Sequence, residues 1–285
     1  MTAPRIVYLN GQFLPYEEAR VPIMDRGFLF ADGIYEVSAI IDGKLVDNAA
    51  HLARLDRSLG EIGIRNPHDA ASWERLQTEL VARNGVTEGL VYMQVTRGVA
   101  ERDFAFPKAG TEPTVMMFTQ AKTVLANPLV ESGARVITVE DLRWKRRDIK
   151  SVALLAQVLA KQQAAEAGVA EAWMVEDGAV TEGSSSTAFI VSRDRVLVTR
   201  PLSTALLPGI TRASVLRLAQ EADLRIEERL IPVEEAYAAQ EAFYTSASAF
   251  VMPVIEIDGR AIGEGHPGPL TRRLRDLYIE AARRG

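Results

Sequence analysis

The sequence has 285 residues, of which 47% are hydrophobic and 25% charged, and a chain of this size can form one large domain or two modest ones. Its net charge of −5 gives no electrostatic reason to expect nucleic acid or an anionic membrane as a partner. The chain has no cysteine, which excludes disulfides, thiolate metal sites and thiol nucleophiles and fits a reducing cytoplasm.

From the N-terminus onward, strand-like and helix-like patterns mix. The opening MTAPRIVYLNGQF lacks the apolar core of a signal peptide, and no apolar run approaches membrane-spanning length, so we expect a cytoplasmic protein. Four stretches with Asn-Gly or Asp-Gly between strand-like runs predict β-hairpins: IVYLNGQFL, VSAIIDGKLV, AWMVEDGAVTE and VIEIDGRAI. Helices are predicted around 49–63, 70–83, 151–167, 211–222 and 269–283. Because the patterns do not alternate strictly, they favour an α+β fold over a doubly wound parallel sheet.

The least patterned stretch, residues 120–136, indicates a boundary between two domains. It reads QAKTVLANPLVESGARV, and its Asn127-Pro128 pair interrupts regular structure. We therefore expect a small N-terminal domain over 1–120, a linker over 121–133 and a larger domain over 134–285.

A lysine directly precedes an apolar helical pattern in RRDIKSVALLAQVLAKQQAAEAG, residues 146–168. Ser151 is predicted as the N-cap of this helix and Gly168 as its end. A charged ammonium at Lys150 would face the positive end of the helix dipole, and its neighbours Ile149 and Val152 would partly desolvate it. Both effects favour the neutral amine that Schiff-base chemistry requires, and the alternative is a solvated lysine in a loop. The apolar positions with helical spacing are Leu154, Leu155, Val158 and Leu159.

Three distant segments add groups that could bind a phosphorylated cofactor. A Pro-Gly turn leads into a helix with Thr211 as the predicted N-cap, where free backbone N–H groups can hold a phosphate or form an ordinary cap. Glu182, in AVTEGSSSTAFIV, is either solvated or buried beside a cation such as a protonated heterocyclic nitrogen. Ser246 and Ser248 could bind an anion or close a turn. A lysine amine, a carboxylate and phosphate donors together are what pyridoxal phosphate requires.

Other site patterns lack the context that their chemistry needs. GEGHPG, residues 263–268, spells the G-x-G-x-x-G dinucleotide pattern, but prolines interrupt it and too little chain follows for a βαβ unit, so we expect a loop. The three histidines, His51, His68 and His266, lack metal-ligand spacing, and no metal site is expected. The sequence has no Walker loop and no G-x-S-x-G elbow, which leaves a Ser-His-Asp hydrolase without support.

Seven motifs follow one another along almost the whole chain: DRGFLFADGIYEV, HLARLDRSL, VYMQVTRGVAERDFAFP, RDIKS, EGSSSTAFIV, LPGITR and SASAFVMPVIEIDG. In this order they make the sequence resemble the fold-type IV pyridoxal-phosphate enzymes, and most closely the D-amino-acid aminotransferase group. The resemblance implies an α+β protein with a small N-terminal α/β domain and a larger C-terminal domain. It also implies a cofactor between the two domains and a site that is completed in a homodimer.

The resemblance further implies roles for individual residues. Lys150 occupies the place of the lysine that forms a Schiff base with pyridoxal 5′-phosphate. Glu182 matches the acid that binds the pyridine nitrogen and holds it protonated, and Tyr35 matches a tyrosine beside the cofactor and the substrate. The remaining cofactor-binding positions, mainly around the phosphate, are Arg54, Ser186, Ile210, Thr211, Ala247 and Ser248.

One motif departs from the family pattern. In the D-amino-acid enzymes, Arg-x-His after TRG reaches the substrate carboxylate, whereas this sequence reads ERDFAF, with Arg102 in the arginine position and Phe104 in the histidine position. An arginine fork can still hold a carboxylate bidentately. The residues that could compensate for the missing histidine, or form surface charge instead, are Arg26, Lys145, Arg146 and Arg147.

The sequence therefore predicts an aminotransferase that moves the amino group of D-amino acids, such as D-alanine and D-glutamate, to 2-oxo acids such as 2-oxoglutarate. Arg102 motivates the choice of D-amino acids. Alternatives within the family are a branched-chain L-amino-acid or (R)-amine aminotransferase and an aminodeoxychorismate lyase. A cofactor-binding protein without catalysis is disfavoured because Lys150, Glu182 and Arg54 are all present.

Overall fold

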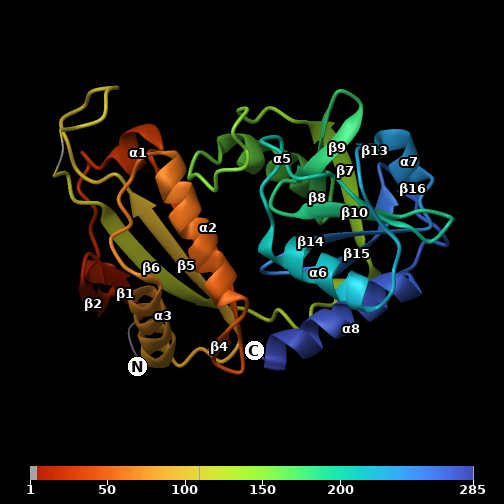
Figure 1. Ribbon diagram of the computed structural model, residues 1–285, viewed down its shortest axis with the longest axis horizontal. Helices are drawn as coiled ribbons and strands as arrows, with labels where there is room; N and C mark the ends of the chain where they lie inside the picture. Colours follow the sequence, from red (N-terminus) through yellow and green to blue (C-terminus); the bar gives the residue numbers. More distant parts are fainter. Residues whose placement is uncertain (1–4, 109, 285) are drawn as a thin grey trace. The chain divides into compact units, whose positions relative to one another are not determined.

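A computed structural model describes residues 5–108 and 110–284 and confirms an α+β fold (Figure 1). The chain forms two compact units, each built from helices around a β-sheet. The first unit comprises Met1–Thr123 and Ile149–Ala153, and the second comprises Val124–Asp148 and Leu154–Gly285. The short segment 149–153, which contains Lys150, therefore belongs with the first unit although the second unit flanks it in sequence.

In the described part of the chain, the first unit contains a six-stranded antiparallel sheet in the order β2-β1-β6-β5-β3-β4. Its strands are β1 (Ile6–Leu9), β2 (Gln12–Pro15), β3 (Gly33–Ile41), β4 (Lys44–Leu45), β5 (Gly89–Thr96) and β6 (Thr114–Ala121). Its helices are the 3-10 helix η1 (Tyr16–Glu18), α1 (Arg26–Phe30), α2 (Asn48–Glu61) and α3 (Ala70–Asn84). Helices α2 and α3 confirm the helices predicted over 49–63 and 70–83.

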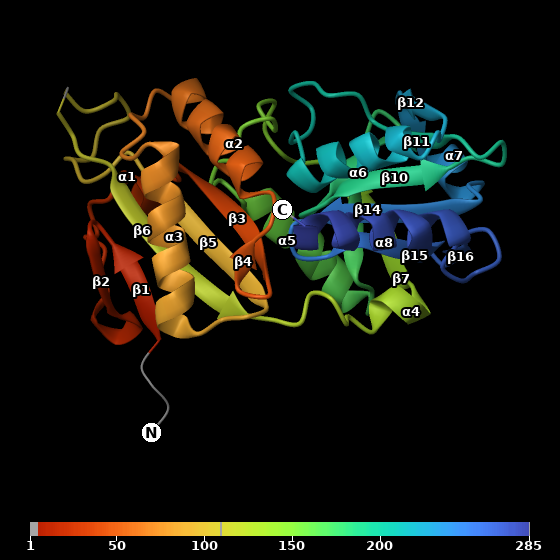
Figure 2. The same ribbon diagram turned by 60° about the horizontal axis from the view of Figure 1, so that its bottom comes forward.

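Helices α2 and α3 cover one face of this sheet (Figure 2). Leu55 and Leu59 of α2 belong to one buried cluster with Ile34 of β3. Because side chains alternate along a strand, Ile34 and Glu36 face the helices while Tyr35 faces the opposite side of the sheet. The two faces of β3 therefore carry different chemistry, with an apolar core on one side and aromatic positions on the other.

Among the described residues, the second unit contains a ten-stranded mixed sheet in the order β12-β11-β10-β14-β15-β7-β8-β9-β13, with β16 paired to β15. Its strands are β7 (Ala134–Glu140), β8 (Glu171–Glu176), β9 (Ala179–Gly183), β10 (Thr187–Val191), β11 (Leu197–Thr199), β12 (Ile226–Glu228), β13 (Ile231–Pro232), β14 (Glu241–Ser246), β15 (Phe250–Ile257) and β16 (Arg260–Ala261). Its helices are α4 (Leu129–Ser132), α5 (Leu155–Glu166), α6 (Ile210–Glu221), α7 (Val233–Tyr237) and α8 (Pro269–Arg284).

Helices α6 and α8 pack side by side against β14 and β15 (Figure 2). They confirm the helices predicted over 211–222 and 269–283. Within residues 5–108 and 110–284, none of the helices combines the length and the apolar content needed to cross a bilayer.

All four predicted hairpins are present, as β1–β2, β3–β4, β8–β9 and β15–β16. In each of them the Asn or Asp and the following Gly both have positive φ, as at Asn10 (46°) and Gly11 (93°). A two-residue type I′ turn needs this conformation at both positions, and Asn, Asp and Gly tolerate it best. These strands were therefore predictable from the turn chemistry between them.

Helix α5 begins at Leu155 rather than at residue 151, so the prediction of Ser151 as its N-cap is wrong. Ser151 instead forms a β-bridge with Ile34 of the distant strand β3. One residue earlier, the carbonyl of Lys150 accepts a hydrogen bond of 3.0 Å from the amide of Tyr35. Because this segment is paired with β3 in extended form, the helix cannot start before the pairing ends.

The two ends of α5 differ in how well the sequence predicts them. Gly168 follows the last turn with a φ of 67°, which confirms its role as the glycine that ends the helix. The buried face of α5 consists of Ala160 and Ala164, which pack in a small core with β8. The larger apolar side chains that indicated the helix are exposed to solvent: Leu155, Val158 and Leu159.

The GEGHPG segment is a loop before α8, as predicted. The buried carboxylate of Glu241 caps this helix by accepting hydrogen bonds from the amides of Leu270 (3.1 Å) and Thr271 (2.8 Å). A Cβ atom at Gly268 would lie 2.0 Å from Cδ of Glu241. The last glycine of the pattern therefore makes room for a helix cap.

Candidate active site

The first unit places Lys150 beside the aromatic ring of Tyr35. The preceding residue, Ile149, is only 4% exposed and belongs to the hydrophobic core under α2, so its packing there holds the segment in place. The Lys150 side chain is partly exposed, and its Nζ atom lies 4.2 Å from the centre of the Tyr35 ring. Two of the residues predicted to form the site are thus brought together by strand pairing.

Tyr35 is the first of three stacked rings on the sheet face that points away from α2. Its ring centre lies 5.6 Å from that of Tyr92 on β5, which lies 4.8 Å from that of Phe118 on β6. Burial raises the pKa of Tyr92, whose hydroxyl donates to Oε1 of Gln94 at 2.8 Å. Tyr92 was not predicted as a site residue, although it occupies an alternating position in the strand-like run VYMQV.

Arg54 lies on the other face of the sheet, where it binds the carboxylate of Glu36, a residue to which the sequence assigned no role. Nε and Nη2 of Arg54 donate to the two carboxylate oxygens of Glu36 at 2.7 and 2.9 Å. His51 Nδ1 lies 2.8 Å from the same carboxylate. Burial alone would raise the pKa of Glu36, which is fully buried, but Arg54 and His51 hold it at about 2. Glu36, His51 and Arg54 form what we call the Glu36 cluster.

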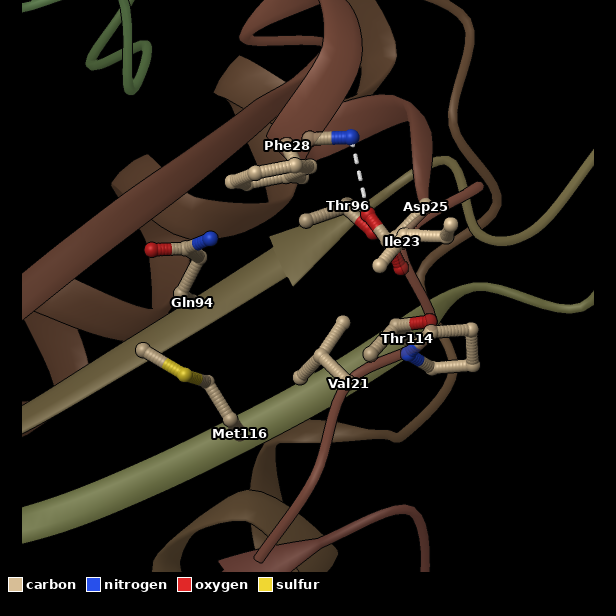
Figure 3. A pocket seen from close by; sticks show the side chains of 10 residues that line it. Val21, Ile23, Asp25, Phe28, Gln94, Thr96, Thr114 and Met116 are labelled. Carbon is tan, nitrogen blue, oxygen red and sulfur yellow. Dashed lines mark hydrogen bonds between the residues drawn. The ribbon is translucent and has the colours of Figure 1, made fainter. Parts of the chain in front are cut away.

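A pocket of about 330 Å³ opens near the start of α1 (Figure 3). Gln94, which lines it, lies two residues after Tyr92 on β5, so the pocket is on the same sheet face as Tyr92. Apolar side chains of the 21–28 segment, Ile23 and Phe28 among them, line it together with Gln94 of β5. Asp25 caps α1 through Oδ1, which accepts from the amide of Gly27 at 2.8 Å. Its Oδ2 atom is buried and has no hydrogen-bond partner among the described residues.

The predicted substrate residue Arg102 is exposed and packs against aromatic rings. Its guanidinium carbon lies 5.3 Å from the centre of the Phe30 ring and 5.5 Å from that of Phe104. These two rings are themselves 5.6 Å apart, and Phe104 is 80% exposed. The residue in the histidine position of the motif therefore lies within cation–π distance of Arg102, a contact that leaves the guanidinium charged.

Arg26 is buried next to Phe30, and its guanidinium is bonded to residues other than a substrate. It is 3% exposed, and its Nε donates to Oδ2 of Asp32 at 2.8 Å. Its Nη1 donates to the carbonyl of Asp103 at 2.6 Å, and its guanidinium lies 4.6 Å from the centre of the Phe30 ring. Arg26 thus ties α1 to the backbone of the segment that carries Arg102.

The basic run 145–147 is ion-paired within the second unit. Lys145 and Arg147 both contact Glu176, at 2.8 and 2.9 Å, and Arg147 also lies 3.2 Å from Asp141. Arg146 lies 3.0 Å from Oδ1 of Asp148. Each cation of this run already has a carboxylate partner within its own unit.

Glu182, at the end of β9, is buried and paired with an arginine that no motif had indicated. Nη1 of Arg143 donates to Oε1 of Glu182, and the amide of Leu207 donates to its two oxygens at 3.2 and 3.3 Å. Asp141 holds Arg143 through Nε and Nη2, at 2.9 and 2.7 Å. Although burial disfavours the charged form of Asp141, the bonds from Arg143 keep the pKa of Asp141 below its ordinary value. The cation that a buried Glu182 requires is therefore supplied by the chain itself.

The same Leu207 amide connects Glu182 to the start of α6. Gly209 is the N-cap of this helix, so the prediction of Thr211 as the N-cap is wrong, and Thr211 is instead a buried residue of the first turn. The Pro-Gly turn stays extended through Gly209 (φ −63°, ψ 130°), and the helix therefore begins at Ile210. Because no side chain among the described residues caps this end, its first backbone N–H groups and the positive end of the dipole can interact with an anion.

Thr187 of β10 lies beside this helix start, and Thr245 is its partner on the neighbouring strand β14. A Cβ atom at Gly209 would lie 2.8 Å from Oγ1 of Thr187, so a larger residue here would force this threonine to move. Thr187 of β10 is paired with Thr245 of β14, which places both side chains on the same face. Oγ1 of Thr245 is buried without a hydrogen-bond partner among the described residues. A buried hydroxyl without a partner needs an explanation, such as a bound ligand or an ordered water, and neither threonine was predicted as a site residue.

The serine patch after Glu182 is organised by the buried carboxylate of Glu171. Ser184, Ser185 and Ser186 all donate to it from their hydroxyl groups, the last at 3.1 Å. A Cβ atom at Gly183 would lie 2.1 Å from Oγ of Ser186, so a larger residue here would displace this hydroxyl. The hydroxyl of the predicted cofactor residue Ser186 is thus engaged within its own loop.

Ser246 is the last residue of β14, and Ala247 and Ser248 lie in the turn that leads to β15. Oγ of Ser246 accepts from the amide of Ala249 at 3.1 Å and lies 3.5 Å from Oγ of Ser248. Ser246 therefore closes the turn, the simpler of its two expected roles.

Comparisons with known proteins agree with these features. Residues 33–257 match the family model for class IV amino-transferases. D-alanine aminotransferase of Staphylococcus aureus (strain MSSA476) is 39% identical over 278 residues, which cover 96% of this chain and 98% of that protein. D-alanine aminotransferase of Bacillus licheniformis is 43% identical over 270 residues, or 94% of each chain.

Solved structures of branched-chain aminotransferases share the fold of this chain. A branched-chain amino acid aminotransferase of T.th. with pyridoxamine 5′-phosphate has a TM-score of 0.90 at 28% identity, covering 99% of this chain and 95% of that chain. A branched-chain aminotransferase of Thermoproteus uzoniensis with norvaline has a TM-score of 0.86 at 29% identity, covering 98% and 94%.

Proposed function

The chain belongs to the class IV aminotransferases, which depend on pyridoxal 5′-phosphate, and we propose that it moves the amino group of D-amino acids to 2-oxo acids. The observation that carries this proposal is the near-full-length similarity to D-alanine aminotransferases from two genera. We expect D-alanine and D-glutamate as donors and 2-oxoglutarate as an acceptor, in two half-reactions with ping-pong kinetics. A cytoplasmic location fits the cysteine-free sequence.

The residues present fit this cofactor. When bound, pyridoxal 5′-phosphate supplies an electron-accepting ring for the charge that develops at the substrate α-carbon. Its aldehyde requires an amine, its ring nitrogen a buried anion, and its phosphate a set of hydrogen-bond donors. The chain offers Lys150, Glu182 and the uncapped start of α6 for these three tasks. The residues proposed to bind the phosphate or its surroundings are Arg54, Ser186, Ile210, Thr211, Ala247 and Ser248.

Lys150 is proposed to anchor the cofactor and to carry the α-proton of the substrate. Hydrogen bonding to β3 fixes the backbone of Lys150, while its four-carbon stem lets Nζ reach more than one atom. The adjoining Tyr35 ring, 4.2 Å from Nζ, excludes water from one side of the amine. A lysine held this way can form a bond to an aldehyde and act as a base after the substrate amine has displaced it.

Glu182 is proposed to bind the ring nitrogen as an ionised carboxylate. The guanidinium of Arg143 favours its charged form, and the amide of Leu207 orients it from the turn before α6. Asp141 in turn holds Arg143, so the carboxylate is fixed before any ligand arrives. Such preorganisation is effective where charge develops during a reaction.

Arg102→Ala should lower the specificity constant for D-alanine by roughly ten- to a hundredfold, because the substrate carboxylate would lose a charged hydrogen-bond donor. An amine substrate without a carboxylate should be affected much less. Phe104→His, which restores the usual residue of the motif, should improve the use of D-amino acids. Steady-state kinetics with both substrate classes measures all three effects.

Arg65→Ala is the matched control for Arg102, because Arg65 is also an exposed arginine of the first unit, paired at 2.6 Å with exposed Glu112. It should behave like the unmodified enzyme. If Arg102→Ala leaves D-alanine kinetics unchanged, Arg102 is a solvated loop residue and does not bind the carboxylate.

A panel of D- and L-amino acids with 2-oxoglutarate tests the proposed substrate class. We expect 2-oxo acid formation from D-alanine and D-glutamate that depends on the added acceptor, as a transferase requires and a lyase does not. The second candidate is a branched-chain L-amino-acid aminotransferase, which the structural similarity to two such enzymes favours. Faster turnover of L-leucine or L-isoleucine than of D-alanine would establish that candidate instead.

We also propose that the enzyme is a homodimer and that α5 contributes to its interface. Leu155, Val158 and Leu159 lie at i, i+3 and i+4 and so share one face of the helix. They are 73%, 58% and 49% exposed, which is unusual for three neighbouring large apolar side chains. A second copy of the chain would bury this stripe.

Leu159→Arg should therefore weaken the dimer by about 2 kcal/mol or more, roughly thirtyfold in its dissociation constant, because a charge would be buried at an apolar interface. Light scattering during size-exclusion chromatography at decreasing protein concentration measures this change. Leu230→Arg is the matched control, because Leu230 is 50% exposed but lies in a loop after β12. Equal dimer stability of the two variants would exclude α5 from the interface.

A further inference from the structure

We infer that Glu36 is a positioning residue that aims Arg54 at the phosphate of the cofactor, so that the Glu36 cluster sets the affinity for the phosphate group. The inference rests on the proposed phosphate-binding role of Arg54. It adds a function for a buried acid, Glu36, to which the sequence assigned no role although it lies in the motif DRGFLFADGIYEV.

The placement of Glu36 links two elements that carry proposed site residues. Tyr35 and Glu36 are consecutive on β3 and face opposite sides of the sheet, the first toward Nζ of Lys150 and the second toward α2. Arg54 and His51 lie one turn apart on α2, so both can reach the same carboxylate. A shift of α2 along β3 would therefore break these contacts to Glu36.

The contact to Glu36 fixes the orientation of the guanidinium. Nε and Nη2 of Arg54 donate to two different oxygens, at 2.7 and 2.9 Å, and this fork defines the plane of the group. Arg54 is 7% exposed and Glu36 is fully buried, so solvent does not compete for these bonds. An arginine held in one plane can meet a phosphate without a further loss of conformational freedom.

A second polar contact holds the start of α2 in the same register. Oγ of Ser38, two residues after Glu36 on the same face of β3, donates to Oδ1 of Asn48 at 3.0 Å. Nδ2 of Asn48 donates to Oε1 of Gln77 on α3 at 2.9 Å. This neighbouring contact stabilises the helix without touching Arg54, which makes it a natural comparison for the Glu36 cluster.

Stability alone is a weak explanation for the Glu36 cluster. A buried ion pair gains little over well-packed apolar side chains of the same volume, because both charges must leave water. Electrostatic attraction of the phosphate does not explain the Glu36 cluster either, since an adjacent carboxylate weakens the attraction between Arg54 and a phosphate. What Glu36 provides is the fixed direction of the guanidinium. We therefore expect loss of this carboxylate to weaken phosphate binding, whereas charge attraction alone predicts that the loss would strengthen it.

Glu36→Asp, which keeps the charge but withdraws the carboxylate by one methylene, should weaken binding of pyridoxal 5′-phosphate to the apoenzyme by roughly ten- to a hundredfold, the range for a charged hydrogen bond. Binding of pyridoxal, which lacks the phosphate, should change by less than about twofold on the same reasoning. Glu36→Gln should act in the same direction. Titration of the apoenzyme with each compound, followed by cofactor absorbance, measures the ratio of the two affinities.

Ser38→Ala is the matched control on the same strand face. It should lower the melting temperature of the apoenzyme but leave the affinity ratio between pyridoxal 5′-phosphate and pyridoxal unchanged. Combining Glu36→Asp with Arg54→Lys should give no further loss of phosphate affinity beyond Arg54→Lys alone, because Glu36 acts through the arginine fork.

Several outcomes would overturn the inference. They are an unchanged affinity ratio in Glu36→Asp, tighter binding of pyridoxal 5′-phosphate in Glu36→Gln, and additive losses in the double variant. If the unmodified apoenzyme does not bind pyridoxal 5′-phosphate, the proposed function fails together with the inference. If it binds the cofactor and Glu36→Asp binds equally well, only the inference fails.

Discussion

Glu182→Gln will lower the rate of the amino-acid half-reaction by roughly a thousandfold, the upper end of the range for removing one preorganised electrostatic contact at a site of developing charge. A neutral amide cannot hold the ring nitrogen of the cofactor protonated, so the ring loses its capacity to accept electrons from the substrate α-carbon. The rate is measured in a single half-reaction with D-alanine by stopped-flow absorbance.

The fold of this variant should survive, because the partners of Glu182 keep their other contacts. Arg143 still donates to Asp141 at 2.9 and 2.7 Å, and the amide of Leu207 still meets a side-chain oxygen. The cofactor should therefore remain bound. Glu176→Gln is the matched control, since Glu176 also pairs with an arginine of the same unit, Arg147, at 2.9 Å. A near-normal half-reaction in Glu182→Gln would remove Glu182 from its proposed role.

Lys150→Ala should abolish turnover, with a loss of at least about ten-thousandfold, the upper range for a single acid–base group. The alanine variant lacks both the amine that anchors the cofactor and the group that carries the α-proton. Added methylamine should restore a small part of the half-reaction, because a free amine can replace the base but not its placement. Turnover is followed as pyruvate formation from D-alanine.

Lys145→Ala serves as the control for this variant, because Lys145 lies five positions earlier in the same segment and is 85% exposed beside Glu176. It should retain the activity of the unmodified enzyme. Residual turnover in Lys150→Ala above roughly one hundredth of that activity would show that another group does the chemistry.

The parts of the fold that were predicted correctly are those that depend on local chemistry. The four Asx-Gly pairs determine their hairpins because both residues must adopt positive φ, whatever the rest of the chain does. The amphipathic helices α2, α3, α6 and α8 were likewise visible from spacing alone. The start of α5 was not, because the Lys150 segment pairs with a strand far away in the sequence, as the bridge between Ser151 and Ile34 shows.

The charged partners within the candidate site were missed for a similar reason. Glu36 binds Arg54 from 18 positions away, and Glu182 binds Arg143 from 39 positions away. Spacing along the chain carries no signal for such pairs. A weaker signal was present, since Glu36 is the single charged residue in the strand GIYEVSAII, and a charge in a buried strand needs a partner. The exposed leucines of α5 show an opposite case, in which a clear sequence pattern misleads. The helical spacing of apolar residues predicted the helix but not which of its faces is buried in the monomer.

Reduction of the unmodified enzyme with sodium borohydride, followed by peptide mapping, tests the central claim most directly. Borohydride converts the bond between a lysine amine and the cofactor aldehyde into a stable secondary amine. The account predicts one pyridoxyl adduct, on the peptide that contains Lys150, and its loss when D-alanine is added before reduction. An adduct on another lysine, or no adduct on an enzyme that has bound the cofactor, would contradict it.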